Sequence, residues 1–142
     1  MDQSIGLLVS LPSEIESKEL SLFENITFNF IADEYDQAEY LFKNGFSRAA
    51  GVVAGVALER HVHLLAEKNN IEVKVNPPTK PKAEFSDYLA SLKKADIINE
   101  VQRKQLDALY QIRKACAHPE EPKKEDIDRL IGEGKLLAST IR

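Results

Sequence analysis

The 142-residue sequence contains a single cysteine and no tryptophan. Because Cys116 has no second cysteine to pair with, an internal disulfide and a cysteine-based zinc site are excluded. A lone thiol is typical of a reducing compartment, so we expect a cytoplasmic protein. Without tryptophan, no large aromatic platform for stacking nucleic-acid bases can be assumed.

Long hydrophobic runs are also missing from the sequence. The longest early run, Ile5–Val9, has no basic leader and is too short for the core of a signal peptide. No stretch approaches the roughly 20 apolar residues that span a bilayer. We therefore expect neither a secretory signal nor a membrane-spanning helix.

Positive charge is in deficit, because the formal net charge is −4. This balance argues against a protein that coats nucleic acid by bulk electrostatics. It leaves room for a local basic cleft, and four basic residues lie between acidic flanks: Arg103, Lys104, Arg113 and Lys114. Apolar residues make up 43% of the chain and charged residues 30%, which is typical of one globular domain over residues 1–142.

The first half of the chain is predicted to begin with a long helix. After an extended segment over residues 1–13, Ser13 and Glu16 have the spacing of a capping box. A helix is expected over 14–43 and should stop at Asn44-Gly45. Its residues at helical spacing are Leu20, Phe23, Ile26 or Thr27, Phe30, Glu34, Ala38 and Leu41.

The second predicted helix starts with Ser47 as its N-cap and runs to Asn69-Asn70. Its first half is small and apolar nearly all round, which is typical of a buried helix. Gly51 and Gly55 lie four positions apart there, a spacing that lets another backbone approach closely. We expect this surface to pack inside a bundle, with a seam between two copies as the alternative.

The rest of the chain is expected to form shorter helices around one loop. Residues 70–83 are rich in proline and are interpreted as a surface loop with at most an isolated extended piece. Further helices are expected over 84–95, from just after Asp96 to near His118, and from Lys124 onward. The sequence thus predicts an all-α, up-and-down bundle of about five helices, with the Pro-rich loop between the second and third.

The most distinctive segment lies at the end of the fourth predicted helix and reads R-K-A-C-A-H-P from Arg113 to Pro119. The carboxyl end of a helix stabilises a cationic imidazole, and histidine titrates near physiological pH. His118 could therefore exchange a proton during catalysis. Arg113 could clamp a phosphate with two parallel hydrogen bonds. Pro119 should end the helix, because it disfavours helical geometry in the preceding residue.

The spacing of these two residues sets a geometric condition. Five positions at 3.6 residues per turn is about 500°, so in a continuous helix Arg113 and His118 diverge by about 140°. They would meet at one phosphate only if the helix end is distorted. The alternative is a site assembled from two chains of a symmetric dimer.

The R-x4-H spacing from Arg113 to His118 resembles the R-x4-6-H motif of the HEPN superfamily. The upstream run from Phe46 to Leu58-Glu59 is similar to the second helix of many such domains, and the order of long and short helices agrees over residues 18–140. Many family members have asparagine directly after the arginine, where this chain has Lys114. Toxins of the family that pair with a nucleotidyltransferase usually carry a tyrosine two positions after the histidine, and Glu120 takes that place here.

The resemblance implies metal-independent RNA cleavage at a cleft between the two protomers of a homodimer. Arg113 would stabilise charge on the phosphoryl oxygens and His118 would move the proton, with Lys114 and Glu59 as candidate supporting residues. No cofactor and no metal ion is implied. The implied partners are RNA or a nucleotide, a second copy of the chain, and an antitoxin or neighbouring protein of a toxin or host-defence system.

Other interpretations of the same segment stay open. Arg113 and His118 could simply satisfy the last carbonyl groups of their own helix. The chain could also be a helical interaction module without catalysis, which Lys114, Glu120 and the negative net charge favour. A third interpretation is a nucleotide or second-messenger binder that uses Arg113 alone for the phosphate.

Residues close to this segment suggest less chemistry. His61 and His63 should point to nearly opposite sides of their helix, which disfavours a shared metal ion. Glu59 is expected to make a buried or interfacial hydrogen bond near the fourth helix. Cys116 lies between Arg113 and His118, and we expect a small buried hydrophobe there instead of a thiol nucleophile.

Overall fold

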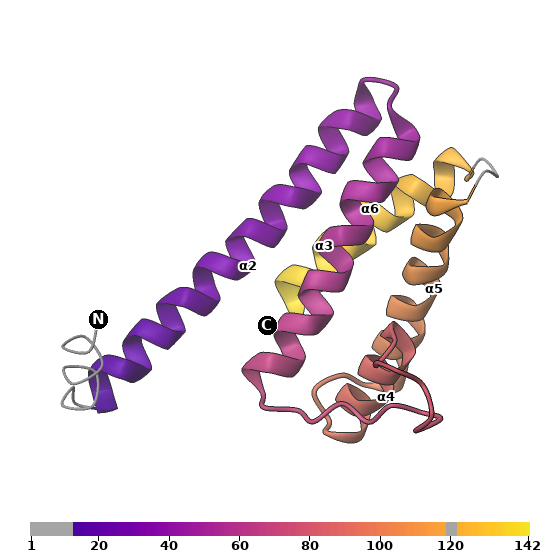
Figure 1. Cartoon of the computed structure of the whole chain (residues 1–142). Coiled ribbons are helices and arrows are strands. Elements are labelled where there is room, and N and C mark those ends of the chain that lie inside the picture. Colours follow the sequence, from indigo (N-terminus) through magenta and orange to yellow (C-terminus); the bar gives the residue numbers. More distant parts are fainter. Residues whose placement is uncertain (1–12, 119–121) are drawn as a thin grey trace.

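The computed structural model describes residues 13–118 and 122–142, with side chains described from residue 22 onward. Within these ranges the chain forms five helices and no strand (Figure 1). The helices are α2 (Ser13–Lys43), α3 (Ser47–Lys68), α4 (Phe85–Lys94), α5 (Glu100–Ala117) and α6 (Lys124–Thr140). The prediction of an all-α bundle of about five helices is confirmed. The expected extended segment, and the capping box expected at Ser13 and Glu16, lie outside the described residues and side chains.

The two long helices α2 and α3 form an antiparallel pair (Figure 1). A tight turn at Asn44-Gly45 joins them, and Gly45 has a φ of +88°, a left-handed conformation that glycine adopts without steric cost. The N-cap of α3 is Phe46, which supplies no side-chain hydrogen bond. The expectation that Ser47 caps this helix is therefore wrong, because the short turn already places Ser47 inside the first helical turn.

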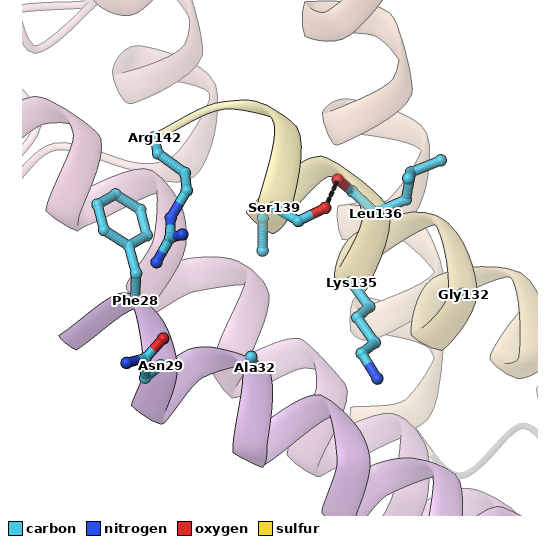
Figure 2. A pocket seen from close by; sticks show the side chains of 9 residues that line it. Phe28, Asn29, Ala32, Gly132, Lys135, Leu136, Ser139 and Arg142 are labelled. Carbon is cyan, nitrogen blue, oxygen red and sulfur yellow. Dashed lines mark hydrogen bonds between the residues drawn. The ribbon is translucent and has the colours of Figure 1, made fainter. Parts of the chain in front are cut away.

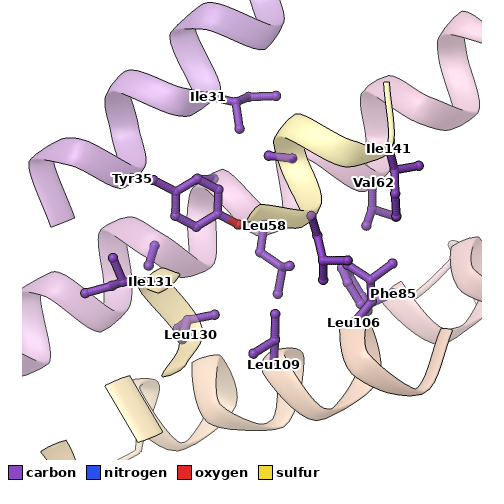
Figure 3. Close-up of a cluster of buried hydrophobic side chains, with 14 of the residues drawn as sticks. Ile31, Tyr35, Leu58, Val62, Phe85, Leu106, Leu109, Leu130, Ile131 and Ile141 are labelled. Atoms are coloured by element: carbon purple, nitrogen blue, oxygen red, sulfur yellow. The ribbon is translucent and has the colours of Figure 1, made fainter. Parts of the chain in front are cut away.

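The core of the molecule forms around α3, which packs against each of the other four helices. Eleven residues of α3 are buried: Ala50, Gly51, Ala54, Gly55, Ala57, Leu58, His61, Val62, Leu64, Leu65 and Ala66. Figure 3 shows Leu58 of α3 among Leu109 of α5 and Leu130 of α6. The small residues in the first half of α3 let these neighbours approach. The prediction that this helix packs inside the bundle is confirmed.

The buried face of α2 differs from the one that the apolar spacing suggests. Its core residues are Phe28, Ile31, Tyr35 and Ala38. Four large apolar residues on the other side remain more than half exposed: Leu22 61%, Phe23 63%, Ile26 59% and Phe30 52%. The reason is that α3 and α6 pack only on the first face, while the N-terminal part of α2 extends past the other helices (Figure 1).

The segment between α3 and α4 is an ordered loop without strand structure. It is held to α4 by Asp87, a residue that is 5% exposed. The Asp87 carboxylate accepts hydrogen bonds from the backbone N–H of Glu84 at 2.9 Å and of Asn76 at 3.3 Å, and it pairs with Lys80 Nζ at 2.8 Å. The Glu84 bond and then the Lys80 bond lower the pKa of Asp87. The loop therefore presents a defined surface beside α4.

The last two helices return toward α3. Asn99 begins α5 with a capping box, because its side chain accepts from the N–H of Gln102 at 2.8 Å and the Gln102 side chain accepts from the N–H of Asn99 at 2.9 Å. α6 then packs against α2, α3 and α5. Its C-terminal end is fixed by His61 of α3, whose Nε2–H donates to the carbonyl oxygen of Ile141 at 2.7 Å.

Candidate functional site

The side chain of Arg113 lies against α3 because α3 has a glycine opposite it. A Cβ atom at Gly55 would overlap Arg113 Cγ and lie 3.1 Å from Arg113 Cβ. Gly51, one turn earlier, gives the same kind of room to Cys116. The two glycines that the sequence suggested for close packing thus set the distance between α3 and the helix that carries the R-x4-H motif.

Arg113 is paired with Glu59 of α3. Arg113 Nε lies 2.8 Å from Glu59 Oε1, and the two side chains are 33% and 31% exposed. The arginine guanidinium carbon is also 6.0 Å from the centre of the Tyr110 ring. Although the pair is close, Glu59 Oε1 is buried and accepts no aligned hydrogen bond from the described residues. The contact is therefore held by charge more than by hydrogen-bond geometry, and a phosphate could compete for the guanidinium.

Arg48, which lies outside the R-x4-H motif, holds the end of α5. Its Nη1 donates to the carbonyl oxygen of Cys116 at 2.9 Å and to that of His118 at 2.6 Å. These carbonyls belong to the acceptors that a helix C-terminus leaves without intrahelical partners, and they carry partial negative charge. The contacts span 68 and 70 positions of sequence, so local spacing carries no signal for them.

His118 ends α5 with its backbone fixed and its side chain exposed. It is the C-cap residue with φ −97° and ψ 162°, the extended conformation expected of a residue before proline. Its N–H donates to the carbonyl oxygen of Ala115 at 3.3 Å, while its own carbonyl accepts from Arg48. The imidazole is thus presented to solvent from a defined position. Glu120, which follows it in sequence, lies outside the described residues.

Cys116, which lies between Arg113 and His118 in the sequence, is buried. Its side chain is 2% exposed and packs at Gly51, which confirms the prediction of a small buried hydrophobe. Burial raises the pKa of the thiol, and the positive charges of Arg48 and Arg113 oppose that effect only in part. A protonated buried thiol is a poor nucleophile.

Arg113 and His118 do not meet within one chain. The helix continues without a break to Ala117, so the divergence of about 140° expected for five positions applies. No hydrogen bond or ring contact joins the two side chains in the described part of the chain, where Arg113 instead faces Glu59. The idea that both cations cap their own helix does not match this arrangement either, because Arg48 supplies the side-chain cap.

A cleft of about 610 Å³ opens beside the Arg113–Glu59 pair, between α3, α4 and α5. Glu59 and Lys114 line it, so both candidate supporting residues belong to its wall. Two aromatic pairs border the same space. The His63 and Tyr88 ring centres are 4.3 Å apart, and Phe85 and Tyr110 are stacked at 4.2 Å with parallel planes.

A second hollow, of about 350 Å³, lies between α2 and α6 and shares no lining residue with the motif. Figure 2 shows Phe28 and Arg142 at one side of it and Lys135 at another. Arg142 covers the Phe28 ring at 4.8 Å, which keeps that ring buried. This hollow is mostly apolar and carries no pairing of acid, base and phosphate-binding groups.

His61 and His63 face different surroundings, as their spacing predicts. His61 is fully buried against Phe28 and Ile141, whereas His63 is exposed beside Tyr88. Among the described residues, no group of three or more metal-ligating side chains comes together. In the same part of the chain, α3 is the one helix long and apolar enough to cross a membrane, and 61% of its most apolar window is buried inside the bundle.

Comparisons with models of known protein families, with curated proteins and with solved structures find no match to this chain.

Proposed function

We propose that this chain is a HEPN-type, metal-independent ribonuclease whose phosphate site is the C-terminal end of α5. The observation that carries the proposal is the state of the two motif residues. His118 is exposed on a backbone that Arg48 holds in place, and Arg113 is one-third exposed in an ion pair with Glu59, with which an RNA phosphate would compete. The resemblance of the R-x4-H segment to the HEPN motif supports the same assignment.

The reaction needs only the substrate and these side chains. The 2′-hydroxyl of RNA attacks the adjacent phosphorus, and a neutral His118 accepts the hydroxyl proton. The bond from phosphorus to the 5′ oxygen breaks, and a protonated histidine returns a proton to that oxygen. The products are a 2′,3′-cyclic phosphate and a 5′-hydroxyl. Arg113 stabilises the charge that develops on the non-bridging oxygens.

A second copy of the chain completes this site in our proposal. Because Arg113 and His118 diverge along an unbroken α5, one chain alone does not direct both at one phosphate. A twofold axis near the end of α5 brings the arginine of one protomer toward the histidine of the other. In the cell we propose a toxin or host-defence role for such a dimer, with an antitoxin or neighbouring protein as its partner.

The first test is cleavage of a single-stranded RNA in EDTA. We expect the wild type to cleave, and Arg113→Gln and His118→Gln each to lose at least 100-fold in rate, as is typical for a general acid–base or charge-stabilising group. Arg129→Gln, which removes an exposed guanidinium on α6, is the matched control and should retain activity. A substrate with 2′-deoxyribose at the cleaved position should resist cleavage, because it lacks the nucleophile.

Mixing the two inactive variants tests the dimer. If the site takes its arginine and histidine from different chains, a mixture of Arg113→Gln and His118→Gln protein should cleave faster than either variant alone. A mixture that stays as inactive as its components would contradict the shared site. Cleavage that persists in both single variants would contradict the assignment of the two residues.

A second candidate function, a helical interaction module without catalysis, is favoured by the Arg113–Glu59 pair. In this interpretation the pair serves only to join α5 to α3. The two candidate functions predict different effects of Glu59→Gln. The glutamine amide carries no charge and cannot neutralise Arg113. A ribonuclease with a freed guanidinium should keep or gain affinity for RNA. An interaction module should lose stability and show no RNA cleavage in any variant.

A further inference from the structure

The cleft between α3, α4 and α5 has the position and size of a nucleotide site. Its wall includes Glu59, the partner of Arg113, and Lys114, the residue after Arg113. The cleft therefore adjoins the Arg113–Glu59 pair. Its volume of about 610 Å³ lies within the range of roughly 300–1,000 Å³ that is usual for small-molecule sites.

One aromatic ring in this cleft, that of His63, is exposed and can stack on a ligand. Tyr110 is already stacked on Phe85 and has the Arg113 guanidinium 6.0 Å from its centre. His63 is exposed, and its ring centre lies 4.3 Å from that of Tyr88 with the planes tilted by 32°. Because His63 lines the cleft, its imidazole can offer a stacking surface to a planar base. Stacking of this kind is how single-stranded nucleic acids are commonly held.

The polar groups of the cleft match one base better than the others. Asp107 and Gln111 lie one helical turn apart on α5, and both line the cleft. An ionised carboxylate only accepts hydrogen bonds. Guanine offers it two adjacent donors on its Watson–Crick edge, N1–H and the N2 amino group. Adenine and cytosine place a ring acceptor where guanine has N1–H, so the carboxylate would repel them.

Two lysines supply positive charge at the edge of the cleft. Lys82 and Lys114 line it, and neither forms an ion pair with another described residue. A nucleotide entering the cleft carries phosphates that these ammonium groups can bind. Lys114 follows Arg113 on α5, and side chains one position apart on a helix diverge by about 100°, so the two cations would contact different phosphates of an RNA strand.

We propose that this cleft binds a guanine nucleotide of single-stranded RNA next to the phosphate at Arg113. The base stacks on His63, Asp107 accepts from its Watson–Crick edge, and Lys114 binds the neighbouring phosphate. This inference rests on the proposed ribonuclease function for its biological meaning. It assigns to that function a preference for guanine beside the cleaved bond.

Binding of mononucleotides tests the cleft without any cleavage step. We would titrate the isotope-labelled full chain with 5′-GMP, AMP, CMP, UMP and inorganic phosphate, and follow amide shifts by NMR. GMP should bind about tenfold or more tightly than the other nucleotides, with shifts at the cleft residues of α3, α4 and α5. Equal affinity for all four nucleotides, or shifts confined to the hollow between α2 and α6, would overturn the proposal.

Three variants assign the contacts. His63→Ala should weaken GMP binding about tenfold, while His63→Phe should retain it because the stacking surface remains. Asp107→Asn should remove the preference for GMP over AMP. Asp128→Asn, at an exposed position on α6, is the matched control and should bind GMP as the wild type does. An unchanged GMP affinity in both His63→Ala and Asp107→Asn would refute the cleft as the base site.

The result of the GMP-binding experiment can be told apart from the result of the RNA-cleavage assay. GMP binding that depends on His63 and Asp107 would stand even if no RNA were cleaved, and it would then describe a nucleotide-binding domain. Conversely, RNA cleavage that depends on Arg113 and His118 but shows no guanine preference would preserve the ribonuclease and reject this cleft.

Discussion

Tyr35 of α2 carries a hydroxyl group that the core does not satisfy. The residue is fully buried, and its oxygen has no hydrogen-bond partner among the described residues. Its ring fills the space opposite Gly134 of α6, where a Cβ atom would lie 2.6 Å from the hydroxyl oxygen. Burial, and then the nearby Glu34, raises the pKa of Tyr35, so the phenol stays neutral. The ring of Tyr35 fills space in the core, whereas its unpaired hydroxyl lowers the stability of the fold.

Replacing Tyr35 by phenylalanine should therefore not weaken the protein. We expect the free energy of unfolding of Tyr35→Phe to stay equal or to rise by up to about 1 kcal/mol, because a buried unpaired polar group is removed. Urea denaturation measures the change. Tyr40→Phe, at a residue that is 70% exposed, is the matched control and should change stability by less than about 0.5 kcal/mol. A loss of more than about 1 kcal/mol in Tyr35→Phe would show that the hydroxyl has a partner.

At the scale of the elements, the close contact between α3 and α5 depends on two glycines of α3, Gly51 and Gly55, which have no side chain. A Cβ atom at Gly51 would overlap Cys116 Sγ and lie 3.3 Å from Cys116 Cβ, both of them buried. A Cβ atom at Gly55 would meet the stem of Arg113, which is half-exposed and can move aside. The two glycines therefore have different consequences. Gly51 controls packing, and Gly55 controls the position of the Arg113 side chain.

Gly51→Ala should destabilise the protein by about 1–3 kcal/mol, because overpacking displaces a buried neighbour. Gly132→Ala is the matched control on α6. Nothing lies within 4 Å of a Cβ atom at Gly132, and the residue is exposed in mid-helix. That substitution should raise the free energy of unfolding by up to about 1 kcal/mol through helix propensity. Equal effects of the two substitutions in chemical denaturation would contradict close packing at Gly51.

At the scale of the whole molecule, His61 joins three helices through one buried ring. It lies on α3, contacts Phe28 of α2 edge-on with ring centres 6.2 Å apart, and donates to the carbonyl of Ile141 after α6. Its Nδ1 has no partner in the described part of the chain. Burial lowers the pKa of His61, the bond to Ile141 opposes this in part, and the charge of Arg142 lowers the pKa further. The folded protein therefore favours the neutral imidazole.

Stability should consequently fall in mild acid. The unfolded chain binds a proton at His61 with the ordinary pKa of about 6.5, while the folded chain resists protonation. The contribution of His61 is fully present above that pH and is lost as the pH falls from about 6.5 toward the lower folded pKa. Unfolding free energies between pH 8 and 5 measure the slope, a range that lies above the titration of Asp87. His61→Gln should flatten the slope relative to that of the wild type. The same slope in wild type and His61→Gln would contradict the assignment.

The sequence by itself determined the elements of this protein. Helix starts and stops depend on nearby residues, such as the turn at Gly45 and the extended geometry that Pro119 imposes on His118. The predicted bounds 14–43 and 84–95 accordingly lie within a residue of α2 and α4. Burial of Cys116 and of the small-residue half of α3 also followed from composition and pattern.

Only the tertiary structure decided which faces meet. The apolar spacing in α2 included Phe23, Ile26 and Phe30, yet the buried side is the one that α3 and α6 cover. The same is true of the candidate site, where Glu59 pairs with Arg113 and Arg48 holds the carbonyls of Cys116 and His118. These contacts join residues far apart in the chain. Local periodicity predicts that a segment is helical, but the packing of the other helices decides which face of that helix is buried.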